Sequence, residues 1–149
     1  MKIYMDVCCY NRPMDDQTQE RVHVETEAIF YILKNLDKRG WDLIGSSVVE
    51  YEFKKNSDVI KQQSAYKFFD YTKTTYNILD YPDTQARANI FQSHGIGSID
   101  SLHLAISECA GVEVLLTTDD RFIKAAKRTD TKVKVINPLI WLMEVSYNE

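Results

Sequence analysis

Residues Gly95 to Phe122 read GIGSIDSLHLAISECAGVEVLLTTDDRF, and this stretch indicates how the chain folds. Its pattern predicts a turn at the two glycines, a helix capped by Ser98, and a second turn at Ala110-Gly111. A strand is expected over Val112 to Leu116, because this run is short and largely apolar, as buried parallel strands are. Another helix is expected to begin at Asp120, directly after that strand's terminal turn.

The helix that begins near Ser98 carries two kinds of face. Apolar side chains recur at helical spacing and predict a buried stripe, made of Ile99, Leu102, Ala105, Ile106 and Cys109. Asp100, His103 and Ser107 share a neighbouring face. Asp100 therefore lies in the first turn of a helix, while Asp119 lies at the carboxyl end of the predicted strand. In open α/β sheets, ligands bind at that edge of the sheet.

Length, charge and cysteine content restrict the class of protein. A chain of 149 residues can bury one core, and we expect a single domain over residues 1–149. The net charge of −4 disfavours a general nucleic-acid coat protein, so nucleic-acid contacts should be local or bridged by metal ions. The three cysteines are odd in number and form no CxxC motif, which favours reduced thiols in a cytoplasmic protein. No segment is long and apolar enough to predict a membrane span.

Predicted strands alternate with predicted helices along the whole chain. The strands are expected at Lys2–Met5, Trp41–Ser46, Val112–Leu116 and Lys132–Ile136. The helices are expected at about 18–38, 47–55, 59–71, 83–94, 98–109 and 120–128, and after Pro138. The segment from Thr72 to Leu79 has the composition of a strand but lies between helices. This alternation predicts an α/β fold with a central, mainly parallel sheet of about four to five strands and helices on both faces.

Four acidic residues are expected at one edge of that sheet. Asp6, Asp100 and Asp119 fall at strand ends or at an adjoining helix start, and Glu52 falls early in the helix after the second strand. Ser47-Val-Val-Glu50 fits a capping box, which would give Glu50 a structural task. Carboxylates that converge repel one another unless cations neutralise them or some of them are protonated. Oxygen ligands of this kind suit Mg²⁺ or Mn²⁺, and two such ions about 4 Å apart can activate water and stabilise a leaving oxygen.

The order of these motifs resembles the PIN-domain family, small metal-dependent endoribonucleases that include toxins of bacterial toxin–antitoxin pairs. Ile3-Tyr-Met-Asp6 resembles the family's first strand with its acid, and Ser47-Val-Val-Glu-Tyr-Glu-Phe53 resembles its second acidic motif. Asp100-Ser-Leu-His-Leu-Ala105 resembles the Asp-Ala-x-His-x-Ala helix start. Leu116-Thr-Thr-Asp-Asp-Arg-Phe122 resembles the Thr-x-Asp-x-x-Phe turn. The family usually has an apolar residue after the acid of the second motif, which favours Glu52 over Glu50.

The resemblance implies the PIN-like fold, dependence on Mg²⁺ or Mn²⁺, and catalytic and metal-binding roles for Asp6, Glu52, Asp100 and Asp119. It implies hydrolysis of RNA that leaves a 5′-phosphate and a 3′-hydroxyl. Arg121 and Lys124, on the helix after the last acid, are candidates to bind RNA phosphates; Lys127 and Arg128 follow on the same helix. An antitoxin partner and a homodimer are both compatible with the resemblance, and the sequence decides neither.

Alternative interpretations stay open at several of these positions. Asp100 and Asp119 also suit helix caps and the helix dipole, although caps alone do not explain the ordered set of four acids. His103 is expected to be a partly buried polar residue bonded to backbone rather than a general base. The cations of the helix that carries Arg121 equally suit a solvated face.

Cys8 departs from the family pattern, which has Ser or Thr two residues after the first acid. A thiol is a poorer hydrogen-bonding group than a hydroxyl, so this departure bears on turnover. It keeps a second class of function open, a PIN-like binding module without catalysis. A haloacid-type or phosphotransfer hydrolase would need an aspartate where Cys8 stands. Residues 56–81 match no motif of the family.

Overall fold

Five parallel strands form the centre of the structure, which is a computed structural model that describes residues 1–148. In chain order they are β1 (Lys2–Met5), β2 (Asp42–Ser46), β3 (Thr74–Tyr76), β4 (Val114–Leu116) and β5 (Lys134–Ile136). Across the sheet the order is β3-β2-β1-β4-β5, and every neighbouring pair is parallel. β1 is central, and its residues Ile3, Tyr4 and Met5 expose no surface. The carboxyl ends of all strands therefore face the same edge of the sheet.

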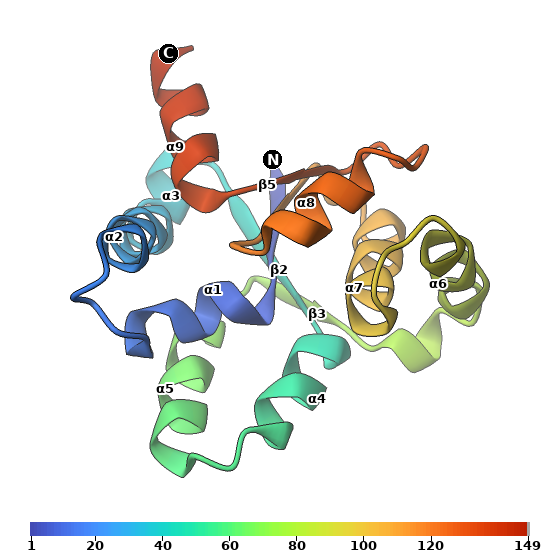
Figure 1. Cartoon of the computed structure of the whole chain (residues 1–149), viewed down its shortest axis with the longest axis horizontal. Helices are drawn as coiled ribbons and strands as arrows, with labels where there is room; N and C mark the ends of the chain where they lie inside the picture. The colour runs from blue at the N-terminus through green and yellow to red at the C-terminus, as the bar shows by residue number, and fades with distance from the viewer. Residues whose placement is uncertain (149) are drawn as a thin grey trace.

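Helices cover this sheet on both sides. They are α1 (Val7–Asn11), α2 (Glu20–Lys34), α3 (Leu36–Arg39), α4 (Ser47–Lys55), α5 (Val59–Phe69), α6 (Asp83–Ser93), α7 (Ser98–Cys109), α8 (Asp120–Ala126) and α9 (Pro138–Tyr147), with short 3₁₀ turns at Arg12–Met14 and Ile78–Asp80. In Figure 1 the strands run through the middle of the molecule, with α6 and α7 on one side and α2 and α9 on the other. Among the described helices, none has the length and hydrophobicity that crossing a membrane requires.

The predicted α/β fold with a parallel, helix-covered sheet is confirmed, and most element boundaries lie within a few residues of expectation. The long helix predicted over 18–38 is two helices, because it ends at Lys34 and a short helix begins at Leu36. Gly40 ends that second helix in the left-handed region (φ 67°), as expected for a glycine in this place. The ambiguous segment after Thr72 is edge strand β3 followed by a 3₁₀ turn.

Two predicted helix caps and one predicted core position are wrong. Strand geometry continues through Ser46, so Ser46 rather than Ser47 caps α4, and its hydroxyl accepts a hydrogen bond from the Val49 N–H. The capping box with Glu50 is therefore absent from this helix. Gly97 occupies the cap position of α7, and Ser98 is the first helical residue. Cys109, expected in the buried stripe of α7, is exposed at the end of that helix.

Close packing limits one glycine of the central sheet. A Cβ atom on Gly45 in β2 would lie 2.6 Å from two ring carbons of Phe69 and 3.0 Å from a methyl group of Thr72. The ring cannot easily move, because it packs against the rings of Tyr10 and Phe53 in the core. The absence of a side chain at Gly45 therefore lets α5 lie against the sheet.

Gly45→Ala should lower the free energy of unfolding by about 1–3 kcal/mol, the usual cost of overpacking a core. Urea denaturation monitored by circular dichroism measures this change. As a control, Phe69→Leu provides space beside position 45, so the double variant should lose less stability than the sum of the two single losses. Strictly additive losses would show that Phe69 does not set the limit at this position.

Candidate functional site

Asp6, the residue after β1, is a buried carboxylate held by hydrogen bonds to both of its oxygens. It is the N-cap of α1, and its Oδ1 accepts from the Val7 N–H at 2.7 Å. Oδ2 accepts from the Thr117 hydroxyl at 2.8 Å, and the Cys8 thiol lies 3.4 Å from the same oxygen. Asp6 is 6% exposed. Its donors come from the ends of two neighbouring strands, so the sheet itself fixes this carboxylate.

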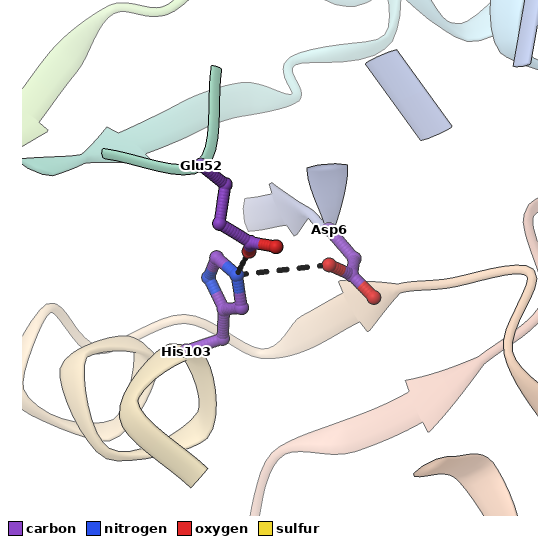
Figure 2. A group of neighbouring side chains, drawn as sticks. All are labelled: Asp6, Glu52 and His103. Atoms are coloured by element: carbon purple, nitrogen blue, oxygen red, sulfur yellow. Dashed lines mark hydrogen bonds and ion pairs between the residues drawn. The ribbon is translucent and has the colours of Figure 1, made fainter. Parts of the chain in front are cut away.

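Glu52 and His103 meet Asp6 from two different helices (Figure 2). The imidazole Nε2 of His103 lies 2.5 Å from Oε1 of Glu52 and 3.6 Å from Oδ1 of Asp6. One ligand atom from each of the three residues lies within 4.8 Å of the other two. His103 is fully buried, whereas the Glu52 side chain is 28% exposed. The predicted approach of Asp6 and Glu52 is confirmed as geometry, and a histidine joins them.

Asp100, in the first turn of α7, is the half-buried acid of the group. Burial raises the pKa of Asp100 to about 7, and the negative charge of Asp6 acts in the same direction. His103 lowers this pKa, while Asp119 and Glu52 raise it further. The three other acids and His103 thus all lie near enough to Asp100 to influence its ionisation. A bound cation would relieve this repulsion.

Asp119 lies at the carboxyl end of the sheet after β4, and it caps α8. Its Oδ1 accepts from the N–H groups of Arg121 and Phe122 at 2.9 and 3.3 Å. Both bonds go to one oxygen, so the cap does not require Oδ2. The capping role and a role toward a ligand are therefore compatible in this residue.

Asp100 and Asp119 line one cavity of about 210 Å³, between the first turns of α7 and α8. Arg121 lines the same cavity, so this predicted phosphate-binding residue lies beside both acids. Lys124 is exposed one turn later and lies outside the residues that line the cavity. Of the two predicted substrate-binding residues, Arg121 has the closer relation to the acids.

His103 differs from its predicted environment. Its ring is bonded to side chains rather than to backbone, since Nδ1 lies 2.5 Å from the Tyr4 hydroxyl and Nε2 contacts Glu52. Burial lowers the pKa of His103, but Glu52, Asp6 and Asp100 together raise it above its ordinary value. The contact between Tyr4 and His103 could not be predicted from the sequence, because Tyr4 lies within an apolar strand and no local pattern indicates a partner for its hydroxyl.

A buried ionic network behind the site also escaped the sequence analysis. Glu25 in α2 is 2% exposed and accepts hydrogen bonds from Arg12, Arg21 and Asn137. Arg21 extends the network to Asp120 and to the Thr118 carbonyl, on either side of Asp119. One feature of the sequence could have indicated it: Glu25 lies on the apolar face of its helix, at helical spacing from the buried Val22 and Ile29. Through Arg21, the network is hydrogen-bonded to both residues that flank Asp119 and holds the turn that contains it.

The donor atoms fit a divalent cation. Carboxylate oxygens suit Mg²⁺ or Mn²⁺, and an imidazole nitrogen is compatible with the transition ions. Four acids lie at this edge of the sheet, and Asp6 is the one that accepts hydrogen bonds at both of its oxygens from fixed groups. Cys8 and Cys9 are free thiols, and the Cys9 thiol bonds the Leu116 carbonyl, away from the acids. The chemistry available here is therefore the binding of cations by carboxylates.

No protein-family model and no curated protein sequence matches the chain. Among solved structures, it is similar to VapBC2 from Rickettsia felis bound to a DNA fragment from its promoter, with a TM-score of 0.56 and 16% identity, covering 92% of this chain and 98% of that chain. FitAcB from Neisseria gonorrhoeae has a TM-score of 0.56 and 18% identity, and the match covers 91% of this chain and 97% of that chain. PAE2754 from Pyrobaculum aerophilum has a TM-score of 0.54 and 12% identity, and the match covers 99% of this chain and 90% of that chain. At these identities the likeness establishes a shared fold, which is the fold predicted from the sequence.

Asp100→Asn should stabilise the metal-free protein more at pH 8 than at pH 5. The pKa of Asp100 in the folded protein, about 7, exceeds the ordinary value in an unfolded chain, so folded Asp100 holds its proton more tightly. Its contribution to stability is therefore fully present below the ordinary pKa of an aspartate, falls as the pH rises above that value, and is lost above about 7. Thermal melting in EDTA at both pH values measures the difference.

Glu27→Gln, which removes an exposed carboxylate from α2, is the control and should show no comparable dependence on pH. If Asp100→Asn instead lowers the melting temperature at every pH, Asp100 serves the structure as a helix-terminal residue.

Proposed function

We propose that this chain, which has the PIN-domain fold, is a metal-dependent endoribonuclease. The observation that carries the proposal is the convergence of Asp6, Glu52, Asp100 and Asp119 at the carboxyl edge of the sheet. Caps and helix dipoles account for single acids, but not for a repelling group of four. Hydrolysis of an RNA phosphodiester would leave a 5′-phosphate and a 3′-hydroxyl.

The four acids would hold Mg²⁺ or Mn²⁺. When bound, such ions supply an activated water and offset the charge on the leaving oxygen, as in two-metal nucleases. Asp6 is the rigid member, because both of its oxygens accept hydrogen bonds from fixed groups. Glu52 is partly exposed and approaches from α4, where its carboxylate can meet both ion and solvent.

Arg121 would orient the RNA backbone. Its side chain borders the cavity that Asp100 and Asp119 also line, so a phosphate held there would lie beside both acids. Lys124 would give a weaker, longer-range attraction from its exposed place on α8. With a net charge of −4, the protein offers little attraction elsewhere, so RNA binding should depend strongly on ions at the site.

The proposal extends to an antitoxin partner. Its support is the sequence resemblance to toxin nucleases of toxin–antitoxin pairs, together with a fold shared with VapBC2 and FitAcB. A binding module without turnover is the alternative, and Cys8 in place of a hydroxyl residue is the observation that favours it.

Purified protein should cut a mixed RNA pool with Mg²⁺ or Mn²⁺ and leave it intact in EDTA. Glu52→Gln should reduce cleavage about 100-fold or more, because it removes a charged ligand from the ions. Glu50→Gln is the matched control on the same helix and should keep most activity. Gel analysis of end-labelled RNA measures all three. Cleavage that persists in EDTA would contradict the metal dependence, and a chain inactive with both ions would be the binding module.

Mn²⁺ should raise the melting temperature of the wild-type protein, because an ion that binds only the folded site stabilises it by mass action. The gain is about 2.7 kcal/mol at a hundredfold excess over the dissociation constant. Asp100→Asn should gain much less, since it lacks one of the proposed ligands. Differential scanning calorimetry with increasing Mn²⁺ gives both shifts. Equal shifts in the two proteins would remove Asp100 from the metal site.

A further inference from the structure

A buried chain of hydrogen bonds runs beneath the acids. The Tyr4 hydroxyl lies 2.7 Å from the Ser46 hydroxyl and 2.5 Å from Nδ1 of His103. On the other side of the ring, Nε2 of His103 lies 2.5 Å from Oε1 of Glu52. Tyr4, Ser46 and His103 are completely buried, and only Glu52 reaches the surface. The chain joins β1, the end of β2, α7 and α4 in a single line.

The protons of this chain can be assigned in two arrangements. An ionised Glu52 carboxylate only accepts, so the hydrogen in the short contact belongs to Nε2 of His103. With a neutral ring, the Ser46 hydroxyl donates to Tyr4, and Tyr4 donates to Nδ1. With a charged ring, Nδ1 donates to Tyr4, and Tyr4 donates to Ser46. Both arrangements keep the Nε2–H directed at Glu52, and in the neutral one every hydroxyl hydrogen of the chain has an acceptor.

We infer that His103 is a positioning residue for Glu52, with Tyr4 and Ser46 fixing the orientation of its ring. The bond from Nε2 holds Oε1, and Figure 2 shows the second carboxylate oxygen of Glu52 turned toward Asp6. This inference rests on the proposed function, because the ions that Glu52 would bind belong to it. Without the bond, the partly exposed Glu52 side chain would rotate freely, and ion binding would then carry the entropic cost of ordering it.

Direct binding of the ion by His103 is the competing assignment. At 2.5 Å, the space between Nε2 and Oε1 fits a shared hydrogen. An ion bound by both atoms would separate them to about 3 Å, because each bond to the ion is about 2.1 Å long. The contact described here is therefore a hydrogen bond from the imidazole to Glu52, and direct binding of an ion is the assignment that the experiment separates from it.

Three variants of the full chain separate these assignments. His103→Leu removes the donor, and His103→Gln places an amide N–H near the position of Nε2. Tyr4→Phe keeps the ring in β1 and removes the hydroxyl that holds His103. Tyr10→Phe is the matched control, because Tyr10 is a buried tyrosine whose hydroxyl has no hydrogen-bond partner within residues 1–148.

Mn²⁺ affinity, measured by the electron paramagnetic resonance signal of the free ion, should fall about 10- to 100-fold in His103→Leu. His103→Gln should recover most of this loss, Tyr4→Phe should lose several-fold, and Tyr10→Phe should bind like the wild type. Pulsed resonance on the Mn²⁺-loaded wild type should detect no directly bound nitrogen. With saturating Mn²⁺, the kcat for RNA should fall in His103→Leu while the KM stays near its wild-type value.

A strong coupling to a bound nitrogen in the wild type would overturn the inference and make His103 a ligand. Unchanged Mn²⁺ affinity in both His103→Leu and Tyr4→Phe would overturn it in favour of a purely structural histidine. If His103→Leu does not fold, Tyr4→Phe and His103→Gln decide by the same readouts. Mn²⁺ binding that depends on His103 in a protein that cuts no RNA would refute the nuclease proposal and leave the positioning role intact.

Discussion

Asp6 stands at the carboxyl end of the central strand, and three further acids lie around it because neighbouring parallel strands end at the same edge. The four acids repel one another, and they differ in how many hydrogen-bond donors stabilise their charge. Asp6 has donors at both oxygens, Glu52 has His103, and Asp119 has two backbone N–H groups. Within residues 1–148, Asp100 has no comparable hydrogen bond, and its pKa rises to about 7. The part of the repulsion that the protein leaves uncompensated is thus concentrated at Asp100, where a cation would have the most to offset.

A second charged cluster, centred on Glu25, holds the turn next to the four acids in place. Glu25 is almost fully buried, and two arginines and Asn137 bond its carboxylate, so its burial is compensated. Arg21 connects this cluster to Asp120 and to the Thr118 carbonyl. Removing both arginines would leave the buried Glu25 carboxylate without a cation, which costs far more than the loss of a surface ion pair. The site therefore depends on α2, an element that contributes no acid to it.

Sequence reasoning placed Asp6 and Asp119 at this edge, because acids after short apolar strands have a fixed place in a parallel sheet. It placed Asp100 in the first turn of the helix that precedes β4. It misplaced the cap of α4 by one residue, because the Glu three residues after Ser47 favoured that serine over its neighbour. Only strand pairing shows that β2 includes Ser46. The hydrogen-bond partners of His103 could not be predicted, because Tyr4 and Glu52 are 99 and 51 residues away from it in the chain. Local patterns predict which elements form, whereas buried polar contacts depend on how those elements pack.

Cys8 can be understood from the same contacts. Where a hydroxyl group would donate strongly to the first acid, the thiol lies 3.4 Å from Oδ2 of Asp6. The Thr117 hydroxyl donates to that oxygen at 2.8 Å, so the orientation of Asp6 does not depend on residue 8. The sulfur instead accepts from the Thr118 N–H and thereby links α1 to the turn before Asp119. The departure from the family pattern therefore leaves the first acid anchored.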